Sequence, residues 1–140
     1  MKLSLAGMIA VFSMLPLWSP PARAQDADIC TDRIKGGNKV EACTRAFNAG
    51  GTPADRAEYL AHRGNSYLAD RAFDKAMADY EAGVKLDARC ARCYAGRAGY
   101  YLLAVKQYDL AIRDANKALE LLPGLAIAIT IRDSAMRQRR

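Results

Sequence analysis

The fold is decided by residues 59–86, which read YLAHRGNSYLADRAFDKAMADYEAGVKL and are matched 35 positions later by YAGRAGYYLLAVKQYDLAIRDANKALEL at residues 94–121. Small residues align with small residues and aromatic residues with aromatic ones, for example Gly64 with Gly99 and Phe73 with Tyr108. A period of this length is typical of stacked supersecondary units that bury their apolar faces on each other. Repeats of this kind usually bind other molecules and rarely catalyse.

Apolar and small residues recur at helical spacing throughout, and no stretch alternates with a period of two, so the sequence predicts an all-α fold. Thr52-Pro53-Ala54-Asp55 is typical of a helix start: the hydroxyl can accept from an early helical N–H, proline fits the first position, and the carboxylate favours the positive end of the dipole. Turn signals place helices near residues 39–48, 52–69, 72–86, 92–105, 108–121 and 125–136.

Residues 1–24 have the features of a secretory signal peptide. Lys2 gives a positive start, residues 3–17 are almost wholly apolar, and Ala22-Arg23-Ala24 supplies small residues at the cleavage spacing. The apolar run is shorter than the roughly 20 residues that a membrane span needs. We therefore expect a mature chain that begins at Gln25, is periplasmic or secreted, and has no stable membrane insertion; an uncleaved anchor is the alternative.

The chain carries 21 basic and 15 acidic residues, a net charge of +6, and loss of the leader would remove two positive charges. Positive charge is concentrated only at the C-terminal end, in Arg132, Arg137, Arg139 and Arg140. Such a tail can touch anionic partners, but the helix dipole alone also favours basic residues there. Export makes nucleic acid an unexpected partner.

The spacing resembles the tetratricopeptide repeat (TPR), whose outline is a large residue, a Leu-Gly pair, a Tyr, then an Ala, an aromatic residue and a closing Pro. Its positions are filled in the first unit by Leu60, Arg63, Gly64, Tyr67, Ala76, Tyr80, Gly83 and Ala88, and in the second by Ala95, Ala98, Gly99, Leu102, Ala111, Ala115, Ala118 and Pro123. The sequence departs from the pattern with Arg63 in place of Leu, with Ala95 and Ala115 at large-residue positions, and with a unit one residue longer than the usual length of about 34.

The resemblance implies about two and a half helix-turn-helix units in a short right-handed α-solenoid with a C-terminal capping helix. It divides the mature chain into residues 25–51, a cysteine-stapled helical prelude and half-repeat; residues 52–90 and 91–124, the two units; and residues 125–140, the capping helix with its basic tail. The small residues of each unit are expected to let helices approach closely, with Tyr67, Phe73, Tyr80 and Tyr108 filling the space beside them.

Four cysteines in a short exported chain indicate two disulfides, with three connectivities possible. The most economical pairing joins Cys30 to Cys43 and Cys90 to Cys93. The first pair would close a loop that constrains the unfolded chain by roughly 3 kcal/mol. A cysteine pair around a short helical prelude, followed by TPR units, is also similar to exported bacterial TPR proteins, which implies an interaction protein without naming its partner.

Cys90-Ala91-Arg92-Cys93 leaves three alternatives open: an inert disulfide, a redox-active pair, or a metal site. A connector that meets a helix start can lower the pKa of a thiol, and nearby arginines add positive charge. No strand precedes the motif, as a thioredoxin-like unit would require. Haem attachment is not expected because Tyr94 follows where His is needed, and the spacing of Cys30 and Cys43 disfavours a four-cysteine zinc site.

The sequence predicts no enzyme, no cofactor and no metal. His62 is the only histidine, and neither a nucleophile nor a second metal ligand stands at helical spacing from it, so we expect a solvated or groove-edge side chain. No phosphate-binding glycine loop is present. Acidic residues are expected at turns and exposed helix positions, where they suit helix starts and charge pairing, namely at Asp70, Asp74, Asp79 and Glu81.

The resemblance implies that the first helix of each unit lines a concave groove that binds a protein or peptide. The matching positions are Glu58, Ala61, Asn65 and Leu68, then Cys93, Gly96, Tyr100 and Leu103. Asn65 and Tyr100 are the expected central contacts, with Arg97 and His62 at the rim and Arg89 at the junction, an arrangement that favours an acidic segment or a terminal carboxylate. Self-association through the C-terminal helix and a thiol–disulfide function of Cys90 and Cys93 are the alternatives.

Overall fold

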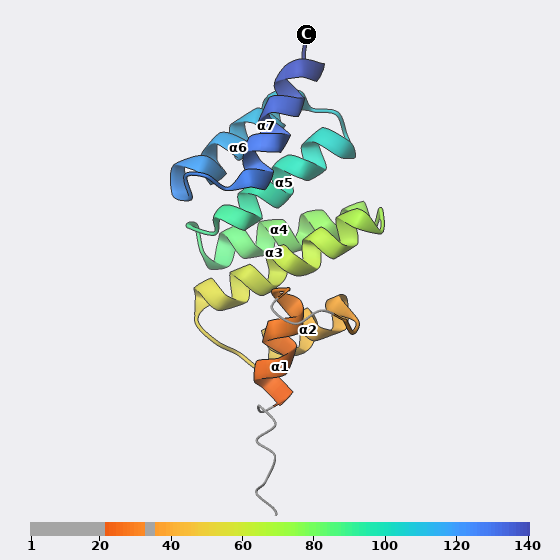
Figure 1. Ribbon diagram of the computed structural model, residues 1–140, viewed down its shortest axis with the longest axis vertical. Coiled ribbons are helices and arrows are strands. Elements are labelled where there is room, and N and C mark those ends of the chain that lie inside the picture. Colours follow the sequence, from red (N-terminus) through yellow and green to blue (C-terminus); the bar gives the residue numbers. More distant parts are fainter. Residues whose placement is uncertain (1–21, 33–35) are drawn as a thin grey trace, which may run out of the picture.

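The computed structural model describes residues 22–32 and 36–140 (Figure 1). These residues form seven α-helices and no strand, which confirms the all-α prediction: α1 Ala22–Cys30, α2 Lys39–Asn48, α3 Pro53–Ala69, α4 Phe73–Leu86, α5 Ala91–Leu103, α6 Tyr108–Leu121 and α7 Ala126–Gln138. Most of the expected signal peptide, residues 1–21, lies outside the described residues. No helix in the described part of the chain has both the length and the apolar character needed to cross a membrane.

Local sequence signals account for the starts of α2 and α3. Thr52 caps α3 by accepting from the backbone N–H of Asp55, whose carboxylate in turn accepts from the backbone N–H of Thr52; each such cap is worth about 1 kcal/mol. Asn38 caps α2 through the N–H of Glu41. The α1 helix is not predicted by the sequence pattern, and its contacts with α2 and α3 stabilise it instead.

The helices pack in chain order, and each odd-numbered helix from α3 onward also contacts the next odd-numbered one: α3 contacts α5, and α5 contacts α7. Figure 1 shows the result as a stack in which α1 and α2 lie at one end, the α3/α4 and α5/α6 pairs follow, and α7 lies at the other end. First helices of successive pairs therefore lie side by side, and this arrangement positions the candidate site.

Two equivalent ion pairs fix the register of the repeat. Arg63 of α3 binds Asp79 of α4, and Arg97 of α5 binds Asp114 of α6. The aspartates of the second helices, α4 and α6, are thus 35 residues apart, as the sequence indicates. The arginines of the first helices, α3 and α5, are only 34 residues apart. The extra residue lies in the α5–α6 connector, residues 104–107, which is one residue longer than the α3–α4 connector, residues 70–72. A uniform offset of 35 is therefore wrong for the first helices.

Both aspartates of these pairs are buried, with Asp79 6% and Asp114 2% exposed. The expectation that Asp79 occupies an exposed position is wrong because its carboxylate faces Arg63 between α3 and α4. The guanidinium of Arg63 binds Asp79 in a bidentate manner, with Nε–Oδ2 at 2.8 Å and Nη2–Oδ1 at 2.7 Å, and its Nη1 donates to Thr44 of α2 at 2.9 Å. One side chain thus joins three helices.

Candidate functional site

A cavity of about 430 Å³ lies between α3, α5 and α7. We call it the apolar groove. It is lined mainly by apolar and small residues, with one amide and one arginine: Asn65, Leu68, Ala69, Arg92, Ala95, Gly96, Gly99, Leu103, Ile127 and Ile131. Ligand sites of small proteins are commonly of this size and have this mixture of apolar walls with a few polar groups.

The groove exists because small residues on α5 leave space between larger ones on the neighbouring helices. A Cβ at Gly99 would lie 3.4 Å from Leu68 Cδ2 and 3.5 Å from Ile131 Cδ1, so the glycine forms part of the floor. Two large apolar side chains stand at the rim, Leu103 with 65% and Ile127 with 54% of its surface exposed. Apolar side chains left in water beside a concave surface offer a favourable contact to an apolar ligand.

Asn65 brings a fixed polar group to this groove. Tyr80 donates its hydroxyl proton to Asn65 Oδ1 at 2.8 Å, and this bond orients the amide. The two N–H groups on Nδ2 and the second lone pair of Oδ1 remain as the hydrogen-bonding capacity that an amide offers to a ligand. The ring of Tyr80 is held in turn by α3 and α5, because a Cβ at Gly64 or Gly96 would collide with it.

A second cavity of about 460 Å³ lies between α1 and α3. We call it the polar cavity, since its lining consists mostly of polar and charged residues: Ala27, Thr31, Asp32, Asp55, Glu58, Tyr59, His62 and Arg92. Arg92 contributes to both cavities, and its Nε lies 3.0 Å from Glu58 Oε2. This ion pair between α3 and α5 therefore lies where the apolar groove and the polar cavity meet.

His62 is largely enclosed by the polar cavity, with 12% of its side chain exposed. Burial, together with the positive charges of Lys39 and Arg92, lowers the pKa of His62 to about 4. The imidazole is therefore neutral at pH 7, although Asp32 Oδ2 lies 3.9 Å from its Nδ1. Burial also raises the pKa of Glu58, an effect that Arg92 opposes.

The structure brings together some of the residues that the sequence predicts for the groove. Asn65, Leu68 and Leu103 line the apolar groove, whereas Glu58 and His62 line the polar cavity. Gly96 also lines the apolar groove, but Ala61 and Cys93 are fully buried.

The other predicted groove residues lie elsewhere. Tyr100 packs its ring edge-on against Phe73 and Tyr101, with centroids 6.4 and 5.7 Å away. Arg97 is bound to Asp114, and Arg89 is exposed in the connector before α5.

Six lining residues are not predicted as such: Arg92, Gly99, Ile127, Ile131, Ala69 and Ala95. The structural register explains the first two, because an offset of 34 places Arg92 on Glu58 and Gly99 on Asn65. The repeated arginine of residues 63 and 97 is the sequence signal that could have revealed this offset. The α7 residues carry no comparable signal, since their place depends on how α7 packs on α5.

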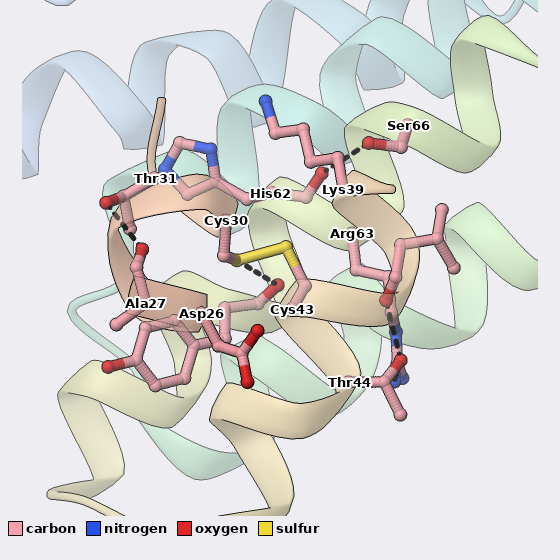
Figure 2. The surroundings of a disulfide bond; sticks show 12 residues. Asp26, Ala27, Cys30, Thr31, Lys39, Cys43, Thr44, His62, Arg63 and Ser66 are labelled. Atoms are coloured by element: carbon pink, nitrogen blue, oxygen red, sulfur yellow. Dashed lines mark hydrogen bonds between the residues drawn. A yellow bond between two sulfur atoms is a disulfide. The ribbon is translucent and has the colours of Figure 1, made fainter. Parts of the chain in front are cut away.

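Two disulfides are present. Cys30 and Cys43 join α1 to α2 with a Cα–Cα distance of 4.7 Å, and both side chains are fully buried. In the view of Figure 2, His62 and Arg63 of α3 lie on either side of this bond. Cys90 and Cys93 form the second disulfide at the start of α5, with a Cα–Cα distance of 5.3 Å. The Sγ atom of Cys93 is 3.5 Å from the carbonyl oxygen of Ala57. Each disulfide therefore packs against α3.

Within the described residues, no group of three or more His, Cys, Asp or Glu side chains is placed to hold a metal ion. The polar cavity is lined by several such side chains, namely Asp32, Asp55, Glu58 and His62. Comparison with protein-family models finds no match, and no curated protein matches the chain.

Proposed function

We propose that this protein is an exported scaffold of the tetratricopeptide type that binds an extended segment of a partner protein in the apolar groove. The observation that carries the proposal is the groove itself: an open apolar surface between the first helices of successive pairs, with the amide of Asn65 exposed within it. Apolar side chains of an extended peptide would fill the space over Gly99, and the amide would bond to the peptide backbone.

The repeat type is supported by the conservation of one contact within the chain. Both helix pairs use an arginine of the first helix to bind a buried aspartate of the second, at Arg63–Asp79 and Arg97–Asp114. The short α2 helix precedes the first pair and α7 follows the second, as expected for a degenerate half-unit and a terminal helix. These features agree with about two and a half units, which would form a short solenoid.

The charges near the groove favour an apolar segment over the acidic segment or terminal carboxylate that the sequence indicates. Arg97 is bound to Asp114, and Arg92 to Glu58. Arg89, the other arginine expected to attract an acidic partner, is exposed but does not line the groove. Since paired guanidinium groups offer less net charge to a ligand, we propose that burial of apolar side chains supplies most of the binding free energy.

A comparative binding experiment tests the groove. The mature chain, immobilised, is used to capture proteins from an envelope extract of the native host, and binding of the captured segment is then measured by calorimetry. Leu103→Lys, at an exposed groove position, should weaken binding by about 1–3 kcal/mol. Leu122→Lys is the matched control because Leu122 is also exposed but does not line the groove. Equal binding by both variants would place the site elsewhere.

Export is tested separately by mass spectrometry of the protein from its native host. We expect a mature N-terminus at Gln25 in a periplasmic or secreted fraction, because Ala22-Arg23-Ala24 provides the cleavage spacing. A chain that keeps Met1 and is found in the cytoplasmic fraction would contradict the expected export. Both disulfides need an oxidising compartment to persist, so the same sample analysed without reduction also reports their state.

The burial of Cys90 and Cys93, 3% and 0% exposed, favours a structural role over the alternative thiol–disulfide function. A redox-active cysteine must be reached by the thiolate of its partner, and here the sulfurs lie among Ala57, Ala61 and Val84. Titration of the pair against a dithiol buffer decides between the two roles. A reduction potential below about −300 mV indicates a structural bridge, and one well above it indicates a redox pair.

A further inference from the structure

The outer face of α7 carries a row of four residues that we call the α7 stripe: Ile129, Arg132, Asp133 and Met136. Ile129 and Met136 are 37% and 41% exposed, and the side chains of Arg132 and Asp133 are 31% and 45% exposed. The spacing of three, four and seven residues places all four on one side of a helix. The buried face of α7, with Ala128, Ile131 and Ala135, packs on α5 and α6 instead.

The corresponding rows on the two earlier first helices are covered by a second helix. Arg63 and Tyr67 of α3 face α4, where Asp79 binds the arginine and Lys75 lies over the Tyr67 ring. Tyr94, Arg97 and Tyr101 of α5 face α6, where Asp114 binds the arginine. Arg132 lies 35 residues after Arg97, so the α7 stripe is the third member of this series.

Within the described residues α7 contacts only α5 and α6, and its arginine has a poor partner. Arg132 Nε lies 3.2 Å from Oδ1 of Asp133, the next residue in the chain. Adjacent residues on a helix do not face each other, and an ion pair this open to solvent contributes little to stability. The arginines at the two equivalent positions instead bind a carboxylate presented by a helix that lies across from them.

We propose that the α7 stripe binds the α7 stripe of a second copy of this chain in an antiparallel, two-fold symmetric pair. The stripe is symmetric about the point between residues 132 and 133. In an antiparallel pair Ile129 therefore lies opposite Met136 of the second copy, and Arg132 lies opposite its Asp133. Both ion pairs and both apolar contacts form at once, as a self-complementary interface requires.

The arrangement favours a second copy over a helix of another protein because the stripe carries its own counter-charge. In the two covered rows the carboxylate belongs to the covering helix, whereas in α7 it is Asp133 on the same stripe. A helix bearing only an acidic residue would leave Asp133 facing that residue or solvent. The contact area of one helix face is small, so the dimer is weak and concentration-dependent.

Analytical ultracentrifugation of the mature chain over a range of concentrations tests the proposal. The wild type should show a monomer–dimer equilibrium. Arg132→Asp places carboxylates opposite each other at two symmetric points and should weaken the dimer about tenfold; Asp133→Arg should have the same effect through opposed arginines. The double exchange, Arg132→Asp with Asp133→Arg, recreates the complementary pairs and should restore dimerisation.

Lys117→Asp is the matched control, because it makes the same change of charge on α6, away from the stripe. Circular dichroism confirms that each variant keeps its helices, and Met136→Lys, at an exposed position, provides a second way to weaken the dimer if an exchange variant fails to fold. A chain that remains monomeric at all concentrations overturns the proposal. This is also the result expected if the α7 stripe binds another protein instead of a second copy. A dimer that survives the single reversals, or that the double exchange fails to restore, overturns it equally.

Discussion

The two halves of this protein are held together by different kinds of contact. In the N-terminal half, α1–α4, separate helices are joined by a disulfide, by the Thr44–Arg63–Asp79 network and by the Arg45–Asp26 ion pair. In the C-terminal half, α5–α7, the core consists mainly of small and apolar side chains, including Ala98, Leu102, Ala111, Ala115, Ile131 and Ala135. Arg97 also binds Asp114 between α5 and α6, and the exposed Arg139 at the end of α7 binds Asp109 of α6.

Helix length accounts for the disulfide and for the Arg45–Asp26 ion pair, which both join the two shortest helices. The α1 and α2 helices have 9 and 10 residues, and helices this short bury too little apolar surface to be stable by themselves. Covalent and charge-assisted links therefore replace packing at that end. The α5–α7 helices have 13 or 14 residues, and their alanines allow close approach over several turns.

The largest difference between the halves is expected at the two buried aspartates. Asp79→Asn should lower the free energy of unfolding by about 4 kcal/mol, because it leaves the half-buried Arg63 without its bidentate partner. Asp114→Asn should cost about 3 kcal/mol, since Arg97 donates one bond to it and the second arginine, Arg113, is largely exposed.

Urea denaturation measures both changes, with Asp109→Asn as a control for an exposed pair with Arg139, where a loss of about 0–1 kcal/mol is expected. Equal losses at Asp79 and Asp114 would show that the second bond of the bidentate Arg63–Asp79 pair contributes nothing to stability. A larger loss of unfolding free energy at Asp114 than at Asp79 would mean that the ion pair contributes more to the C-terminal half than to the N-terminal half.

The helices follow from the sequence because their signals are local. The Asn38 and Thr52 caps, the turn before Phe73 and the Pro123-Gly124 pair each act within a few residues. The bounds expected for residues 39–48 and 108–121 are those of α2 and α6. The α1 helix is the exception, because its stability comes from the disulfide and from contacts with α2 and α3.

The candidate site is less predictable because it depends on register between helices. A single extra residue in the α5–α6 connector shifts α5 by one position relative to α3, and on a helix this rotates a side chain by about 100°. Tyr100 therefore packs on Phe73, and Gly99 takes the place in the groove. The arginine that departs from the repeat pattern at position 63 is the better guide to register, since it recurs at position 97 with a buried partner.

The two disulfides provide the second comparison. Replacing Cys30 and Cys43 together by alanine should lower stability by about 3 kcal/mol, because this bond closes the longer loop and fixes α1 to α2. The same double replacement at Cys90 and Cys93 should cost no more than about 2 kcal/mol, since the residues are only three apart and remain enclosed by α3 and α4. Thermal unfolding without reductant measures both, and a larger loss at the second pair would contradict the entropic account.

Acid should weaken the N-terminal half through His62. The folded state keeps this imidazole neutral down to pH about 4, while in the unfolded chain it takes up a proton near pH 6.5. The unfolded state therefore binds more protons between these values, and stability present above pH 6.5 is lost as the pH falls towards 4, by about 2 kcal/mol. His62→Gln should remove this part of the pH dependence, as measured by urea denaturation at pH 7 and pH 4.5. An unchanged dependence in the variant would assign the acid sensitivity to carboxylates.

The smallest expected effect separates two glycines three residues apart on α5. At Gly96 a Cβ would collide with the Tyr80 ring, whereas at Gly99 it would make ordinary contacts with Leu68 and Ile131. Overpacking costs about 1–3 kcal/mol, and replacing a helical glycine by alanine returns up to about 1 kcal/mol. Gly96→Ala should therefore lower the free energy of unfolding by about 1 kcal/mol, and Gly99→Ala should leave it unchanged or raise it.

Urea denaturation of both variants in the wild-type and Tyr80→Leu backgrounds identifies the cause. If the Tyr80 ring is what clashes with the new methyl group, Gly96→Ala should change the free energy of unfolding little in the Tyr80→Leu background. The effects of the two substitutions should then not be additive. Gly99→Ala should behave alike in both backgrounds, because its neighbours are Leu68 and Ile131. A Gly96→Ala variant as stable as the Gly99→Ala variant would mean that Tyr80 moves aside. The Tyr80 hydroxyl that orients Asn65 would then be able to change position. The packing of Tyr80 against Gly64 and Gly96 would be less rigid than their close contacts indicate.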